Sequence, residues 1–293
     1  MSIVGWVSEA PTRLRERANQ GIRDAAGLTH DPPPICTDPA ESYMAPDSIS
    51  RLIHGDLSSM MIGGIAALLF EMLHPHSMAG VAQHSRYRDD PLDRVLQTAN
   101  FIGYTTYGSR SRAHGAIERV LSVHQAVRGV ADDGQPYYAN DPHLLAWIHD
   151  AGASMFLRGY QRYGAVGLSE SDADRYVLEQ ATLARDLGAE NPPTTVAELD
   201  AALEAFRPEL RLSHDGTLAR DFVERGIVRG ALQRTVYRLL VESAYSILDP
   251  WARELLGSPS RPLRNRWVLR PATGLLTWAV RLAVPPVPPF TSP

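Results

Sequence analysis

The chain of 293 residues is long enough for one large domain or two small ones, and its 44% hydrophobic and 21% charged residues indicate a globular protein with a core. The net charge of -4 gives no general attraction to nucleic acid, so no nucleic-acid partner is expected. All 29 basic residues are arginine and the only cysteine is Cys36, which excludes lysine-dependent pyridoxal-phosphate and P-loop chemistry, intrachain disulfides and multi-cysteine metal sites.

The predicted elements are almost all helical. Residues 1–45 form an irregular, proline-punctuated N-terminal arm, and from residue 46 the apolar residues recur with helical period, without an alternating strand pattern. Residues 131–136 form a turn. The predicted helices cover Asp47–Leu73, Met78–Gln83, Asp90–Tyr107, Ser109–Val130, Asp141–Tyr163, Ser169–Leu187, Thr195–Phe206 and Thr217–Leu256, the last as two helices.

This order of elements predicts a single all-α domain over residues 46–257. Residues 258–293 form a Pro- and Arg-rich tail that packs on the domain. The start of helix Asp141–Tyr163 has an N-cap followed by proline, and Ser169–Asp172 has the form of a capping box. Met60–Phe70 is an apolar run of about half the length of a membrane span, which predicts a buried core helix.

His124 is the first candidate for chemistry. It falls on the apolar stripe of helix Ser109–Val130, which also carries Ile117, Val120, Leu121 and Val127. An inward-facing imidazole needs a hydrogen-bond partner, a metal or a cofactor. Periodicity alone favours a core histidine bonded to a carbonyl and leaves the ligand role open.

Arg94 and Thr98 are a second candidate pair, because they lie four residues apart on one helix with Gln97 beside them. A guanidinium there can bind carboxylates of an anionic cofactor, while the alternative is a solvated helix face. His149, on the face of Leu145 and Phe156, either lines a pocket or has a structural role.

Several histidines suggest a metal site. His74-Pro-His76, with His54 and His84 nearby, offers imidazoles, and Glu71-Met-Leu-His74 is one Glu-x-x-His element of a di-iron bundle. A di-iron site needs a second such element, and the sequence has none. A zinc site at the bent His-Pro-His segment is equally weakly supported.

These segments, taken in order, resemble the latex-clearing-protein and MpaB-type oxygenase family over residues 47–257. The motifs that carry the resemblance are Leu73-His-Pro75, Gly80-Val-Ala-Gln-His-Ser85, Asp90-Pro-Leu-Asp-Arg94-Val-Leu-Gln-Thr98, Tyr107-Gly108, Val123-His-Gln-Ala-Val-Arg-Gly129, Asp133-Gly-Gln-Pro-Tyr137-Tyr-Ala139, Asp141-Pro-His-Leu-Leu-Ala-Trp147-Ile-His149 and Arg253-Glu-Leu-Leu-Gly257. Each motif is weak alone, and their order and spacing together are specific.

The resemblance implies a helical fold with a globin-like core and extra helices that hold one haem b. It implies that His124 is the proximal iron ligand, that Arg94 and Thr98 support haem binding, and that Arg128 and His149 lie near the haem or stabilise its pocket. Members of the family use dioxygen. Latex-clearing protein cleaves polyisoprene, and other members act on smaller compounds.

The chain departs at three positions from residues found in latex-clearing protein or in other members of the family. Gln97 stands where that protein has a distal lysine, Leu121 replaces an arginine common one turn before the proximal histidine, and Gly129 stands where some members have a second histidine. These departures argue against polyisoprene cleavage. The expected function is therefore a haem-dependent oxygenase that acts with dioxygen on a small apolar substrate, with Gln97, Thr98 and Arg94 as candidate catalytic residues.

Two other functions stay open: a haem protein with a peroxidase-like or gas-binding role, and a haem-free helical protein that binds an apolar ligand or partner. The single cysteine fits a reducing, cytoplasmic compartment. The tail carries arginines and two tryptophans, Trp267 and Trp278, so a weak contact with a membrane surface is the alternative to a tail packed on the domain.

Overall fold

The computed structural model describes residues 35–226, 228, 230–258 and 264–286, and the greater part of the expected N-terminal arm, residues 1–34, lies outside this range. In the described part of the chain the structure is helical apart from one two-stranded sheet, which confirms the all-α prediction. The main helices are α2 (Ile49–His54), α3 (Leu57–Glu71), α4 (Pro75–His84), α5 (Pro91–Tyr107), α6 (Arg110–Ala126), α7 (Pro142–Tyr163), α8 (Glu170–Asp186), α9 (Val196–Phe206), α10 (His214–Arg225), α11 (Ala231–Ile247), α12 (Pro250–Leu255) and α14 (Arg270–Ala283).

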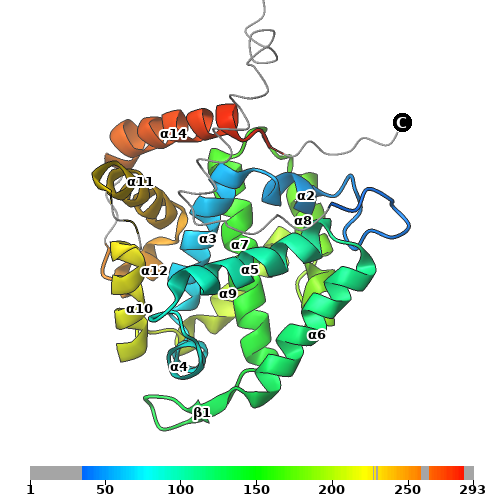
Figure 1. Ribbon diagram of the computed structural model, residues 1–293. Coiled ribbons are helices and arrows are strands. Elements are labelled where there is room, and N and C mark those ends of the chain that lie inside the picture. The colour runs from blue at the N-terminus through cyan, green and yellow to red at the C-terminus, as the bar shows by residue number, and fades with distance from the viewer. Residues whose placement is uncertain (1–34, 227, 229, 259–263, 287–293) are drawn as a thin grey trace, which may run out of the picture.

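Helices α3 and α7 form the centre of the molecule, with the other helices arranged around them (Figure 1). They approach closely because glycines meet at the crossing: a Cβ atom at Gly159 would lie 3.1 Å from both Cα of Gly63 and the carbonyl oxygen of Ser59. Gly63 has no side chain, which leaves room for this approach. Buried aromatic and aliphatic side chains, among them Trp147 and Phe70, complete the core around this pair.

Short polar side chains and prolines set the helix starts. Asp90 caps α5 by accepting a hydrogen bond from the amide of Asp93 (3.1 Å), and Pro91 occupies the first turn. Asp141 and Pro142 do the same for α7. The predicted capping box is present at α8, where Ser169 and Asp172 bond each other's backbone amides.

The predicted helix Ser109–Val130 ends earlier than expected. α6 stops at Ala126, and β1 (Arg128–Val130) pairs in antiparallel register with β2 (Pro136–Tyr138) across the predicted turn. The valines and tyrosines of these segments favour extended backbone, and the Asp133-Gly134 turn brings them together. The sequence analysis predicted no strands, and this hairpin shows that the prediction was wrong at these residues.

Other boundaries also differ from those predicted. The segment Asp47–Leu73 is divided into α2 and α3 at Gly55-Asp56, where Asp56 caps the second helix. The segment predicted as Thr217–Leu256 contains α10, α11 and α12. Pro75 starts α4 at the first-turn position that proline tolerates, three residues before the predicted start.

The tail contains a helix, α14, which contacts α3, α7 and α11. Arg281 of α14 reaches the buried Asp56, with its Nη2 atom 2.6 Å and its Nε atom 3.0 Å from Oδ2. Leu275 and Trp278 of the same helix are exposed. No single helix within the described ranges is long and apolar enough to cross a membrane, although α3 and α4, bent by 104° at their junction, meet that criterion as a pair.

Candidate active site around His124

In the second half of α6, other parts of the protein cover the apolar stripe only partly. Ile117 is buried as predicted, whereas Val120, Leu121 and His124 are only partly buried and Val123 is 57% exposed. The Nδ1 atom of His124 is buried and has no hydrogen-bond partner. The Nδ1 atom therefore makes no hydrogen bond to a backbone carbonyl.

Arg94 connects His124 with a carboxyl group on α3. Burial and the nearby Arg94 guanidinium both lower the pKa of His124, so its imidazole is neutral at neutral pH. Burial raises the pKa of Glu71 to about 8, and the attraction of Arg94 opposes this rise. The Arg94 guanidinium thus affects the charge of both the Glu71 carboxyl group and the His124 imidazole.

Glu71 faces α7 across a partly open surface. A methyl group placed at Gly152 would lie 3.6 Å from Oε1 of Glu71, so the face of α3 with Leu68 and Glu71 meets the face of α7 with Ile148 and Gly152. Leu68 is 42% exposed and Ile148 is 38% exposed, although both belong to the central helices. Large apolar side chains on these faces thus remain uncovered.

Helices α5 and α6 pack against each other, and in the described part of the chain neither packs extensively on α3 or α7. His124 on α6 and Glu71 on α3 are both influenced by Arg94 on α5, and α3, α6 and α7 each carry an exposed apolar side chain. These residues provide a neutral imidazole, a cation and a protonated carboxyl next to apolar walls. Such a set suits a large, mostly apolar ligand that carries a metal and acidic groups.

The predicted catalytic residues Gln97 and Thr98 lie on the exposed side of α5. The Gln97 amide donates to Oδ2 of Asp93 (2.6 Å), and the Thr98 hydroxyl donates to the carbonyl of Arg94 (3.2 Å). Both side chains are thus bound to their own helix. Arg94 has the electrostatic link to His124 that a shared site requires, and the roles of Gln97 and Thr98 stay predictions.

His149 and Arg128 lie on different elements, α7 and β1. His149 is partly buried on α7, where burial lowers its pKa to about 4 against the opposing effect of the Gln180 backbone. Arg128 is exposed on β1, and its carbonyl accepts a hydrogen bond from Nε2 of His84 (3.2 Å). Neither position tests the cofactor role predicted for these side chains.

The local structure explains the glycine at position 129. A Cβ atom there would lie 2.6 Å from Oε1 of Gln83 and 2.7 Å from the Tyr137 hydroxyl. These two groups are hydrogen-bonded to each other at 2.8 Å. A histidine at this position, as in some relatives, would have to displace that pair.

The histidines of the suggested metal site do not converge. His54 bonds the hydroxyls of Thr106 (2.8 Å) and Tyr176 (3.1 Å), and burial lowers its pKa to about 4. His84 bonds the backbone of β1, and His76 lies 3.1 Å from Asp133. His74 instead lies near His143 and Glu209, which sequence reasoning did not connect with it.

Glu71 is the residue of this site that sequence reasoning missed. Its only signal was the Glu-x-x-His spacing with His74, which was considered for di-iron chemistry alone. The partly open face that it shares with Gly152 depends on the crossing of α3 and α7, and no local pattern predicts that crossing.

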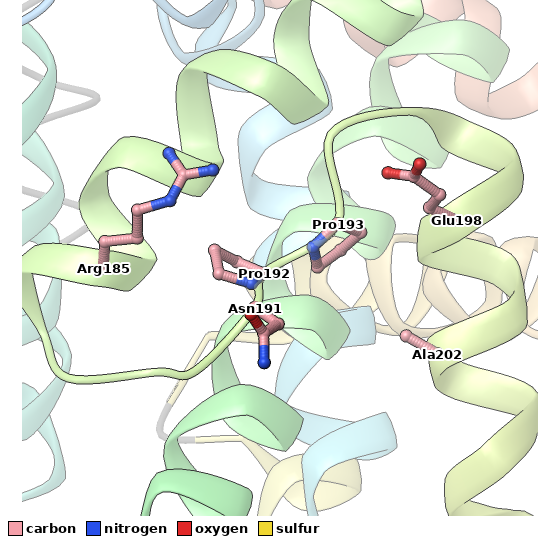
Figure 2. A pocket seen from close by; sticks show the side chains of 6 residues that line it. All are labelled: Arg185, Asn191, Pro192, Pro193, Glu198 and Ala202. Atoms are coloured by element: carbon pink, nitrogen blue, oxygen red, sulfur yellow. The ribbon is translucent and has the colours of Figure 1, made fainter.

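A separate hollow of about 560 Å³ lies between the end of α8 and α9 (Figure 2). Its lining residues are Arg185, Asn191, Pro192, Pro193, Glu198 and Ala202. The Glu198 carboxylate accepts hydrogen bonds from the amide and hydroxyl of Thr194, both at 2.8 Å, just before the N-cap of α9. None of the candidate residues lines this hollow.

Comparison with known proteins identifies the family. Residues 51–282 match the family model described as "ER-bound oxygenase mpaB/B'/Rubber oxygenase, catalytic domain". Among solved structures, one of latex clearing protein in the closed state has a TM-score of 0.50 and 19% sequence identity, with 96% of this chain and 75% of that chain covered. No curated protein has significant similarity to the chain. Since the family model spans most of the sequence, the chain belongs to the MpaB and rubber oxygenase family and carries its oxygenase-type catalytic domain.

Proposed function

We propose that this protein is a haem b-dependent oxygenase that acts with dioxygen on a small apolar substrate, and that His124 is the axial ligand of the haem iron. The observation that carries the proposal is the state of His124. Its imidazole is neutral, its Nδ1 atom is buried without a hydrogen-bond partner, and it stands at the edge of uncovered apolar surface. A neutral imidazole is the form that ligates iron.

The residues around His124 fit the remaining parts of a haem. The macrocycle is flat and apolar, which suits the uncovered faces that carry Leu68 on α3 and Ile148 on α7. Its propionates require a cation, and Arg94 supplies one beside the imidazole. We assign Thr98, His149 and Arg128 supporting roles in the pocket, on the ground of the family resemblance.

When bound, the haem iron supplies the binding and activation of dioxygen. The chain supplies the surroundings. Glu71, with its raised pKa, holds a proton on its carboxyl group at neutral pH and can exchange it with a group bound beside it. Apolar side chains of α3 and α7 exclude water from the substrate and orient it by shape.

A small apolar substrate, rather than polyisoprene, agrees with the identity of residue 97. The amide of Gln97 is bonded to Asp93 and carries no charge, so the distal role of the family's lysine is absent or altered here. The cytoplasmic location expected from the single cysteine belongs to the same proposal.

The test is a visible spectrum of freshly purified and haem-reconstituted protein. We expect a Soret band in the wild type and its loss, together with at least about a tenfold loss of bound iron, in His124→Ala. The matched control is His114→Ala, which removes an exposed histidine from the same helix and is expected to keep the band. Absence of the band from reconstituted wild type, or equal spectra for both variants, would contradict the haem assignment.

Oxygen uptake then tests the reaction. Holoprotein is expected to consume dioxygen in the presence of a small apolar substrate and not with polyisoprene. A holoprotein that binds haem but consumes no dioxygen with any member of a panel of prenylated and aromatic compounds would favour the peroxidase-like or gas-binding role instead.

A further inference from the structure

Three side chains from distant parts of the sequence converge beside the α3–α4 corner. His74 is the N-cap residue of α4, His143 lies in the first turn of α7, and Glu209 ends the short 3₁₀ helix η2 (Arg207–Glu209). The Nε2 atom of His143 is 3.0 Å from Oε1 and 2.9 Å from Oε2 of Glu209. The Nε2 atom of His74 is 3.5 Å from Oε2, and one donor atom from each residue lies within 4.8 Å of the others.

The imidazole of His74 is buried, and its two nitrogen atoms lack hydrogen-bond partners. The residue is 2% exposed, and both of its ring nitrogens are buried without a hydrogen bond. Its 3.5 Å separation from Glu209 is longer than a good hydrogen bond. A buried polar group without a partner is costly, which indicates that a ligand for this nitrogen is missing.

Neighbouring rings fix the two histidines before any ligand arrives. Phe206 of α9 packs on His143 with ring centroids 4.5 Å apart and planes inclined by 33°. Trp147 packs against His74 at 6.0 Å. Because both imidazoles are already held, binding of a ligand between them would cost little side-chain entropy.

The chemistry of the donors selects the ligand. Two imidazole nitrogens and one carboxylate suit a divalent first-row transition metal such as Zn²⁺, whereas Ca²⁺ and Mg²⁺ prefer oxygen donors. Tetrahedral zinc places its donors roughly 3.3 Å apart, given bonds of about 2.0 Å. The separations of 2.9 Å and 3.5 Å from Glu209 Oε2 to the two histidines are close to that spacing.

We propose that His74, His143 and Glu209 form a zinc-class metal site, separate from the iron ligand assigned to His124. The side chains of His143 and Glu209 are 55% and 43% exposed, which leaves room for water as a fourth ligand. The metal connects the α3–α4 corner, the start of α7 and η2. It thereby closes two long loops of the chain and stabilises the folded state.

The test uses full-length protein without a polyhistidine tag, dialysed against Zn²⁺ and then against metal-free buffer. Zinc and iron per chain are measured separately by elemental analysis, so that haem iron is not counted as site metal. The variants are His143→Ala and Glu209→Gln, whose exposed side chains make a folding failure improbable. The control is His114→Ala, an exposed histidine near Asp186 and outside the cluster.

We expect about one zinc per chain in wild type and in His114→Ala, and at least about a tenfold loss of retained zinc in the other two variants. Zinc is also expected to raise the Tm of wild type by about 5 °C and to leave the Tm of both cluster variants unchanged. Failure of wild type to retain zinc, or equal retention in all four proteins, would overturn the proposal. Neither result depends on whether haem is bound.

Discussion

At the scale of single residues, Glu71 has the most consequential environment in the proposed active site. Its carboxyl group is partly buried against Gly152, and the nearby Arg94 does not outweigh the effect of burial on its pKa, which rises to about 8. Because a carboxyl group in the unfolded chain has a pKa near 4.5, the folded protein keeps a proton here that the unfolded chain releases.

This difference makes the stability of the protein depend on pH. Between about pH 4.5 and pH 8 the folded state binds more protons than the unfolded state, so the free energy of unfolding falls as the pH rises. Glu71→Gln removes the titration. We expect the variant to be more stable than wild type at pH 8, by about 4 kcal/mol, and nearly equal to it at pH 4.5.

Urea unfolding at the two pH values measures this effect. Glu118→Gln, which changes an exposed carboxyl group on α6, serves as the control and is expected to differ from wild type by less than about 0.5 kcal/mol. If Glu71→Gln were less stable than wild type at pH 8, the folded protein would stabilise a charged Glu71. That result would contradict the conclusion that its carboxyl group is protonated.

The sequence identified some of these residues and not others, for a physical reason. His124 was singled out because its helix has a clear apolar period, and Arg94 because it lies on a neighbouring amphipathic helix. His143 and Glu209 come together only through the packing of α7, α9 and η2, which no local pattern encodes. The catalytic and cofactor roles assigned from the resemblance remain predictions.

At the scale of elements, the crossing of α3 and α7 positions Glu71 and two residues of the proposed metal site. Glu71 ends α3 and His74 follows it, while Gly152 and His143 belong to α7. The crossing depends on Gly159, since a Cβ atom at this residue would press on the backbone of Gly63 and Ser59 at 3.1 Å. Backbone atoms cannot move aside as the end of a flexible side chain can.

We therefore expect Gly159→Ala to destabilise the protein by about 2 kcal/mol, because the two helices must separate to accept the methyl group. Gly115→Ala on α6 is the matched control. A Cβ atom there would meet nothing within 4 Å, and the higher helix propensity of alanine should stabilise the protein by about 0.5 to 1 kcal/mol. Thermal or urea unfolding of both variants measures the contrast, and equal effects would show that the crossing tolerates a wider spacing.

The starts of α5, α7 and α8 were predictable from sequence, whereas some other boundaries were not. Proline and capping residues at the starts of α5, α7 and α8 act locally, so their signals can be read directly. The end of α6 has no such signal, because Val127 and Val130 continue the apolar spacing of the helix. The β1–β2 pairing decides that boundary, and pairing depends on residues beyond the turn.

At the scale of the whole molecule, helical period predicted the fold class, and the order of motifs predicted the family. The arrangement of the helices did not follow from either. In particular, α14 was expected only as part of a tail, yet it reaches the N-cap of α3, 225 residues earlier in the chain. Contact of its exposed Leu275 and Trp278 with a membrane surface stays a prediction.

One buried ion pair joins α14 to the start of α3. The side chain of Asp56 is 1% exposed and that of Arg281 is 20% exposed, and the remaining partners of the carboxylate are the Ser58 hydroxyl at 2.7 Å and the Ser59 amide at 3.4 Å. Arg281 also donates to the carbonyl of Tyr163 at the end of α7. Removal of the guanidinium therefore leaves a buried carboxylate without its cation.

We expect Arg281→Ala to lower the free energy of unfolding by about 3 kcal/mol, and Arg270→Ala, which changes an exposed arginine of the same helix, to lower it by less than about 0.5 kcal/mol. Urea unfolding measures both values. Adding Asp56→Asn to Arg281→Ala removes the unpaired Asp56 carboxylate, so part of the lost free energy of unfolding should be recovered. The coupling energy of this double-mutant cycle separates the ion pair from the packing of the arginine stem. A loss that is the same with and without Asp56→Asn would assign the stability to packing of α14 alone.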